Sequence, residues 1–116
     1  MAEKSLVEIL GTGATRLASG AAAPSEGLFI PDSLLISAGL TTPTTATAEG
    51  HIVAIVKLLK DNLSQTAYDL DNDNSVYLSD GFASFTTRGT TQYRIDQIIF
   101  NLAKVDSEST LDPTKY

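Results

Sequence analysis

The chain of 116 residues lacks cysteine and tryptophan and contains a single histidine. Without cysteine, disulfide bonds and thiolate metal sites are excluded. Aromatic residues make up only 7% of the chain, and its length suffices for one domain with a modest core. Basic residues are also few, eight against fourteen acidic ones, which leaves a net charge of −6. Because phosphate binding requires a basic face, this charge argues against a nucleic-acid partner.

Long apolar runs are missing as well. The apolar stretches are too short to span a bilayer, and no cluster of lysine and arginine forms a patch for a membrane surface. The first residues, Met1–Lys4, do not begin the charged and apolar pattern of a signal peptide. We therefore expect a protein that is made in the cytoplasm and has no membrane partner.

Motifs of catalysis are sparse. The segment Gly11-Thr12-Gly13 lacks the third glycine of a dinucleotide-binding turn, and no βαβ pattern follows it. No Gly-x-Ser-x-Gly is present, and His51 falls in the first turn of a predicted helix, where we expect a surface or boundary residue. These observations predict that the chain is not an enzyme and has no catalytic residue. A small enzyme of unknown type stays open, because residues distant in sequence can meet in the fold.

The clearest periodicity lies in residues 48–64. Five apolar residues follow the spacing of one helix face, namely Ile52, Ile55, Val56, Leu59 and Leu63. Thr47 is the expected N-cap, and Glu49 in the first turn complements the helix dipole. Val53 and Leu58 broaden the apolar stripe, which predicts a helix covered on more than one side.

A β-hairpin is predicted in the last third of the chain. Strand-like runs at 82–87 and 91–95 flank Arg88-Gly89, where Gly89 supplies a positive φ, and a shorter run lies at 76–78. Near Gln97 the apolar residues change face, which indicates either a bulge or a strand buried on both sides. The fold class is therefore α+β, with one amphipathic helix packed on a small antiparallel sheet that ends in a C-terminal β-hairpin.

The chain divides into three predicted parts. Residues 1–26 are rich in glycine and alanine and form a long extended N-terminal arm. Residues 27–106 form a single compact α+β domain with its core in 48–105, and residues 107–116 form a polar tail. Apolar patches near the arm lack a core of their own and are candidates for binding a partner. Their members are Leu6, Val7, Ile9, Leu10, Leu28, Phe29 and Ile30.

An acidic loop follows the predicted helix. Asp69, Asp71 and Asp73 alternate, and Asp80 is the twelfth position when Asp69 is counted as the first. The loop 69–80 therefore resembles an EF-hand calcium loop. It departs from that pattern because Asn74 replaces the glycine, Asp80 replaces the glutamate, and a strand follows instead of a helix. A turn built on the local hydrogen bonds of Asp and Asn explains the same residues. No metal site or cofactor is predicted, and a calcium-dependent binding module is kept as an alternative.

In composition and layout the whole chain resembles the small accessory structural proteins of tailed bacteriophage particles, such as capsid cement or decoration proteins and small tail components. Like them it is acidic, free of cysteine and rich in Thr, Ala and Gly, with an arm beside a β-rich body. The resemblance implies a structural subunit that binds and stabilises a larger assembly, most simply a virion. The implied partners are a major capsid or tail protein and further copies of the chain itself.

Overall fold

The computed structural model describes residues 4–105 and 110–116, and it confirms the α+β class. Within these residues no helix has both the length and the apolar character needed to cross a membrane. The chain divides into two compact units, Met1–Leu58 and Leu59–Tyr116. The arm, domain and tail boundaries expected from the sequence stay a prediction, and residues 106–109 lie outside the described residues.

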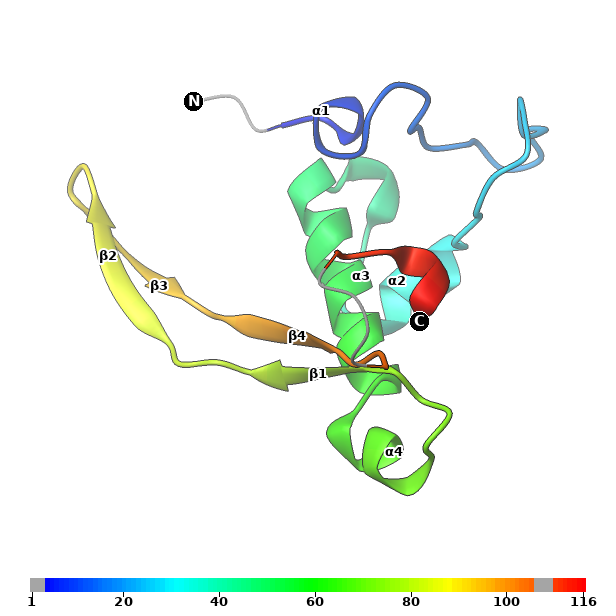
Figure 1. The fold of residues 1–116 in the computed structure, drawn as a ribbon. Helices are drawn as coiled ribbons and strands as arrows, with labels where there is room; N and C mark the ends of the chain where they lie inside the picture. Colours follow the sequence, from blue (N-terminus) through cyan, green and yellow to red (C-terminus); the bar gives the residue numbers. More distant parts are fainter. Residues whose placement is uncertain (1–3, 106–109) are drawn as a thin grey trace. The chain divides into compact units, whose positions relative to one another are not determined.

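The first unit is built around two helices, α2 (Asp32–Ser37) and α3 (Ala48–Asn62), of which α3 continues into the second unit (Figure 1). The short helix α1 (Leu6–Leu10) and the 3₁₀ turn η1 (Pro43–Thr45) complete it. Its core is small, and its buried and half-buried apolar members are Leu35, Ala38, Ala54, Ile30, Leu40, Ile55 and Leu58. Burial of so few apolar side chains supplies limited stabilisation.

Helix α3 begins where the sequence predicts. The Thr47 hydroxyl accepts a hydrogen bond from the Gly50 N–H at 3.0 Å, which confirms the N-cap. The buried face of the helix differs from the predicted stripe, because it is centred on His51 and Ala54. Val53 is exposed, so the expectation that it broadens the buried stripe is wrong. The methyl side chain of Ala54 allows close packing against the α2 residues, which a larger side chain would prevent.

Two short helices go beyond the sequence prediction. Residues 6–10 of the arm form α1, whose first turn is closed by a capping box. In this motif Glu8 N–H donates to the Ser5 hydroxyl at 3.3 Å, and Ser5 N–H donates to the Glu8 carboxylate at 3.1 Å. In the second unit, the Ser64 hydroxyl caps α4 (Gln65–Leu70) by accepting from Ala67 N–H at 3.2 Å. Both helices are too short to persist without such caps.

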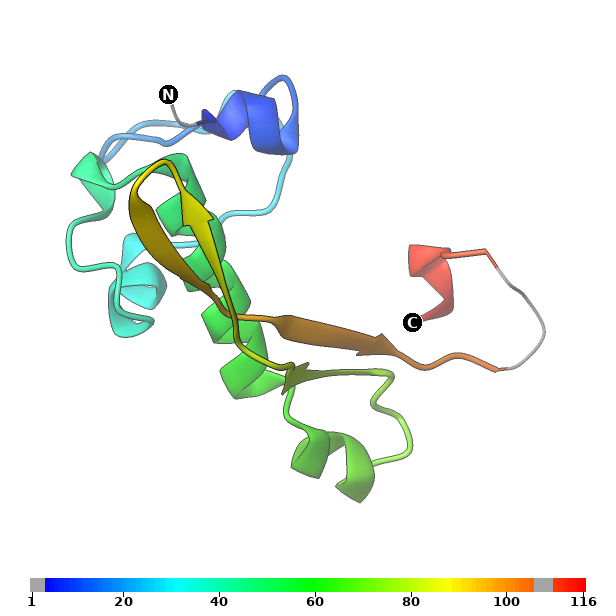
Figure 2. The same ribbon diagram turned by 90° about the vertical axis from the view of Figure 1, so that its left-hand side faces the viewer.

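The second unit contains a long antiparallel ribbon in two parts (Figure 1 and Figure 2). Strand β1 (Val76–Asp80) pairs with β4 (Ile98–Leu102), and β2 (Ser84–Arg88) pairs with β3 (Thr91–Ile95) between them. Gly89 at the turn has φ of +59°, which confirms the predicted hairpin. The 3₁₀ turn η2 (Pro113–Lys115) lies in the predicted tail.

The two parts of the ribbon meet at an interruption near Gln97, where the sequence predicts either a bulge or a strand buried on both sides. Burial on both sides is wrong, because Ile99, Phe100 and Leu102 in β4 are exposed. Strands β3 and β4 are separated by Asp96 and Gln97, and Gly81 N–H donates to the Gln97 carbonyl at 2.7 Å. In β1, Leu78 is buried, and its N–H donates to the Leu63 carbonyl at 2.9 Å. The β1–β4 part is therefore anchored within its unit at the base of the ribbon.

Candidate functional site

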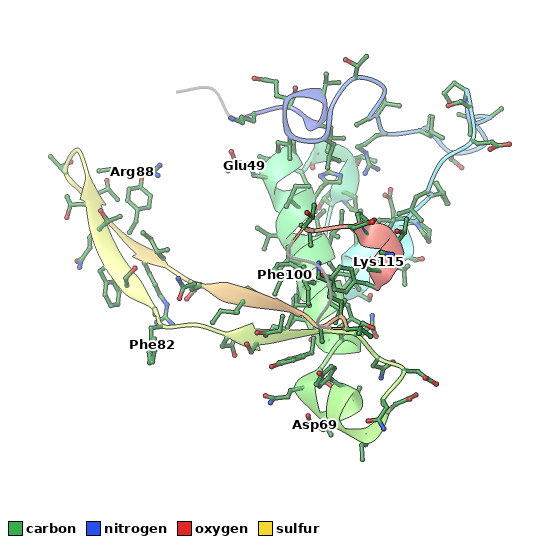
Figure 3. All side chains as sticks on the ribbon, viewed as in Figure 1. Glu49, Asp69, Phe82, Arg88, Phe100 and Lys115 are labelled. Atoms are coloured by element: carbon green, nitrogen blue, oxygen red, sulfur yellow. The ribbon has the colours of Figure 1, made fainter. Side chains whose placement is uncertain are left out.

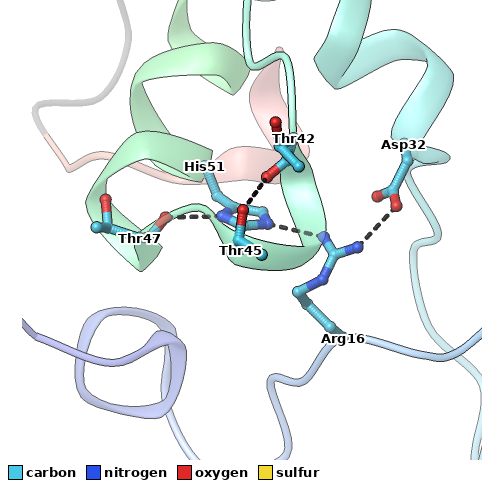
Figure 4. A network of polar contacts seen from close by, with 6 residues as sticks. All are labelled: Arg16, Asp32, Thr42, Thr45, Thr47 and His51. Carbon is cyan, nitrogen blue, oxygen red and sulfur yellow. Dashed lines mark hydrogen bonds and ion pairs between the residues drawn. The ribbon is translucent and has the colours of Figure 1, made fainter.

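A polar network joins three segments of the first unit around His51 (Figure 4). The Arg16 guanidinium approaches the His51 Nε2 at 2.7 Å and donates to the Asp32 carboxylate at 2.7 Å. The other ring nitrogen, Nδ1, lies 2.7 Å from the Thr47 carbonyl oxygen. His51 is only 6% exposed, so the expectation of a surface or boundary residue is wrong. Arg16 contacts both His51 and Asp32 and thereby attaches the arm to α2 and α3.

The partners of His51 determine its tautomer. A carbonyl oxygen can only accept, so Nδ1 carries the hydrogen and donates to Thr47. A guanidinium can only donate, so the Nε2 lone pair accepts from Arg16. Both ring nitrogens are therefore engaged in hydrogen bonds. This network attaches the arm to α2 and α3.

The carboxylate at the end of the network titrates below its usual range. The hydrogen bond from the Arg16 guanidinium lowers the pKa of Asp32 from its ordinary value of 3.8, and the positive charge of Arg16 acts in the same direction. Partial desolvation opposes this shift. Asp32 is therefore ionised, and the Arg16–Asp32 ion pair is formed, at neutral pH.

Two of the four aspartates in the loop that resembles an EF-hand, Asp71 and Asp80, have side-chain contacts. Asp80 at the end of β1 forms an ion pair with Lys60 at 2.5 Å. Asp71 accepts from Asp73 N–H at 2.9 Å, the local turn bond that the alternative interpretation expects. In the described part of the chain, no three His, Cys, Asp or Glu side chains gather as a metal site would require. The calcium alternative stays a prediction, and this arrangement does not favour it.

A hollow of about 220 Å³ lies beside the acidic loop. It is lined by Tyr68, Asp69, Asn72 and Asn74, all close to the end of α4. The Asn74 side chain already donates to the Ala67 carbonyl at 3.0 Å. A single carboxylate lines this hollow, so it lacks the several charged oxygens that a calcium ion needs.

The seven apolar residues that the sequence marks as candidates for binding a partner occupy different environments. Leu28 and Phe29 are 91% and 71% exposed, as a binding surface requires. Ile30 packs against the core of the first unit. On α1, Val7 and Leu10 are exposed, whereas Leu6 and Ile9 are half-buried. The structure therefore leaves Leu28 and Phe29 as the most accessible pair among the seven candidates.

A second exposed surface lies on the predicted β-hairpin, which the structure forms from β2 and β3. Every residue of these two strands is exposed, including Phe85, Tyr93 and Ile95. Figure 3 shows Phe82 at the bend before β2 and Arg88 near the hairpin tip. The Arg88 guanidinium lies 5.7 Å from the centre of the Tyr93 ring, a cation–π contact. The hairpin pattern in the sequence already makes this surface a candidate for pairing with a strand of a neighbouring chain.

Comparisons with protein-family models, with curated proteins and with solved structures find no match for this chain.

Proposed function

We propose that this chain is a structural subunit without enzymatic activity that binds a protein partner and stabilises a larger assembly. One observation carries this proposal. Among the described residues, seventeen large hydrophobic side chains are exposed, whereas only four hydrophobic side chains are buried. Burial of apolar area contributes about 25 cal/mol per Å², so covering these side chains with a partner would be strongly favourable. Exposed apolar patches larger than those of a typical monomer mark interaction sites.

Two groups among the exposed residues are candidate surfaces. One is the Leu28–Phe29 pair, and the other is the β2–β3 ribbon with Phe82 at its base. An isolated two-stranded ribbon is marginally stable in water, so contact with another chain would stabilise β2 and β3. Both surfaces combine aromatic and aliphatic side chains, the residue types enriched at the centres of protein interfaces.

The resemblance in composition and layout supports a virion as the assembly. A capsid cement or decoration protein, or a small tail component, would use such surfaces to bind a major capsid or tail protein and copies of itself. The net charge of −6 agrees with a protein partner rather than a nucleic-acid one.

Sedimentation in a density gradient tests the proposal. In lysate from the cells or virions that contain it naturally, the chain should sediment with a large particle. Replacing both exposed side chains, Leu28→Ser with Phe29→Ser, should weaken this association by about tenfold or more, because two apolar anchors are lost. A chain that stays with small proteins at the top of the gradient would contradict the proposal.

The matched control is Val53→Ser, an exposed apolar residue on α3 outside both candidate surfaces. This variant should sediment with the particle as the wild-type chain does. Circular dichroism of the purified variants verifies that each remains folded. If Val53→Ser and the double variant lose association equally, the loss is not specific to the Leu28–Phe29 surface.

A further inference from the structure

We infer that the outer edge of β2 pairs with β2 of a second copy of this chain, which joins two ribbons into a four-stranded antiparallel sheet. The inference rests on the proposed function, because it names one partner of the same exposed ribbon. The register of the hairpin determines which backbone groups of β2 face outward. Arg88 and Thr91 flank a two-residue turn and are paired, as are Thr86 with Tyr93 and Ser84 with Ile95.

Hydrogen-bonded and non-hydrogen-bonded pairs alternate along an antiparallel ladder. In a hairpin with a two-residue turn, the pair that flanks the turn is a hydrogen-bonded pair. The alternation then leaves the backbone N–H and C=O groups of Phe85 and Thr87 facing outward from β2. On β3 the outward groups belong to Gln92 and Arg94. Each strand therefore offers two residues with which an incoming strand can pair.

The two edges differ in their protection. Natural edges are blocked by proline, by charged side chains, by bulges or by covering segments. On β3 the outward residue Arg94 is charged and forms an ion pair with Asp96 at 2.7 Å. On β2 the outward residues Phe85 and Thr87 are uncharged residues of high strand propensity. Residues 82–97 contain neither proline nor lysine on either strand, so the charged Arg94 is what distinguishes the two edges, and β2 is the less protected one.

A second copy of β2 can pair with all the outward backbone groups of this edge and brings no like charges into contact. In an antiparallel pairing centred on Thr86, Phe85 faces Thr87 of the other copy, so that all outward groups meet in two hydrogen-bonded pairs. Thr86 then faces its own counterpart, a favourable cross-strand pair. Arg88, which carries the single charge of β2, faces Ser84. The two Arg88 positions lie four residues apart along the strands, about 14 Å, which exceeds the screening length of about 8 Å.

The β2–β2 pairing by itself buries little surface area. Five residues from each strand bury less area than a standard interface of about 1,600 Å². We therefore expect a weak dimer in dilute solution that becomes effective in an assembly, where many such contacts act together.

A single cysteine tests the register, because the natural chain has none. In the proposed pairing the two Thr86 Cα atoms lie about 4.5 Å apart, within disulfide range. Purified Thr86→Cys should therefore form a disulfide dimer under mild oxidation. The control is Gln92→Cys, also exposed and on the other edge of the same ribbon. In the four-stranded sheet its two copies would be at least about 14 Å apart, because three strand spacings separate them.

We expect the dimer yield of Thr86→Cys to exceed that of Gln92→Cys by about tenfold, because pairing raises the local thiol concentration. Equal yields, no disulfide dimer of Thr86→Cys, or a higher yield for Gln92→Cys would each overturn the inference. Amide exchange of the unmodified chain provides a second measurement. As concentration rises, the Phe85 and Thr87 amides should become protected while those of Gln92 and Arg94 do not, and unchanged exchange would contradict the pairing.

These experiments use the purified chain alone, so they separate the inference from the proposed function. A chain that sediments with a particle but shows no Thr86 dimer retains the function and loses the β2 pairing. A chain that dimerises through Thr86 but never sediments with a particle retains the pairing and loses the function.

Discussion

At the scale of single residues, the most specific feature is the attachment of the arm by Arg16. One guanidinium binds both the His51 imidazole and the Asp32 carboxylate, and His51 is held from the other side by Thr47. Each of these polar groups has a partner of opposite hydrogen-bonding character, which a buried histidine requires. The arm is thus fixed at a defined point although its neighbouring glycine and alanine residues bury little area.

Asp32→Asn should destabilise the chain at pH 7 and should have less effect in acid. The pKa of Asp32 is lower in the folded chain than its ordinary value of 3.8, so its ionised form stabilises folding above that pH. This contribution is lost as the pH falls through the folded-state pKa. Urea unfolding from pH 7 to pH 3 should therefore show a difference between wild type and variant that shrinks below about pH 4.

Asp61→Asn is the control for this measurement, since Asp61 is an exposed carboxylate on α3 outside the network. It should leave stability at pH 7 nearly unchanged, as surface substitutions usually do. A difference between wild type and Asp32→Asn that is independent of pH would show that the carboxylate charge does not stabilise this network.

At the scale of elements, the junction between the two parts of the ribbon depends on close contact between Gly81 and Gln97. A Cβ atom placed on Gly81 would lie 2.9 Å from the Gln97 Cβ and would also meet its Oε1. The Gly81 N–H donates to the Gln97 carbonyl at 2.7 Å, so the two backbones cannot separate without losing that bond. Glycine is required here by space and not by an unusual φ.

Gly81→Ala should therefore lower the free energy of unfolding by about 1–3 kcal/mol, the usual cost of forcing extra volume into a close contact. Thermal unfolding followed by circular dichroism measures the loss. Gly27→Ala is the matched control, since a Cβ there meets nothing within 4 Å and φ is not positive. Equal melting temperatures for Gly81→Ala and wild type would show that the junction relaxes without cost.

At the scale of the whole molecule, charge and exposed apolar surface oppose one another. Because fourteen acidic residues outnumber eight basic ones, copies of the chain repel one another electrostatically at neutral pH. The exposed side chains, Leu28 and Phe82 foremost, favour association. Self-association should therefore depend on pH in a direction that the composition determines.

Light scattering should increase as the pH falls from 7 toward the isoelectric point of about 4.5, where the repulsion vanishes. Added salt at pH 7 should raise the scattering part of the way, because it screens the same repulsion. The double variant Leu28→Ser, Phe29→Ser should scatter less at pH 4.5 than the wild type. Scattering that stays constant across this pH range would contradict an association driven by exposed apolar surface.

The sequence by itself determined the local features of this protein. Thr47 as an N-cap and the turn at Gly89 follow from interactions between residues close in the chain, and the change of face near Gln97 is visible in the apolar pattern of the sequence. Periodicity likewise located α3, whose extent depends on its apolar spacing and its cap. The α+β class followed from these elements.

Only the tertiary structure decided which surfaces are covered. Burial of His51 and exposure of Val53 depend on where α2 and Arg16 meet α3, and the sequence pattern of α3 does not contain that information. The same holds for β2 and β3, whose alternating residues suit a buried sheet although no described segment covers them. Local hydrogen bonds determine elements, whereas burial depends on contacts between residues far apart in the chain, and such contacts become visible only when the chain is folded.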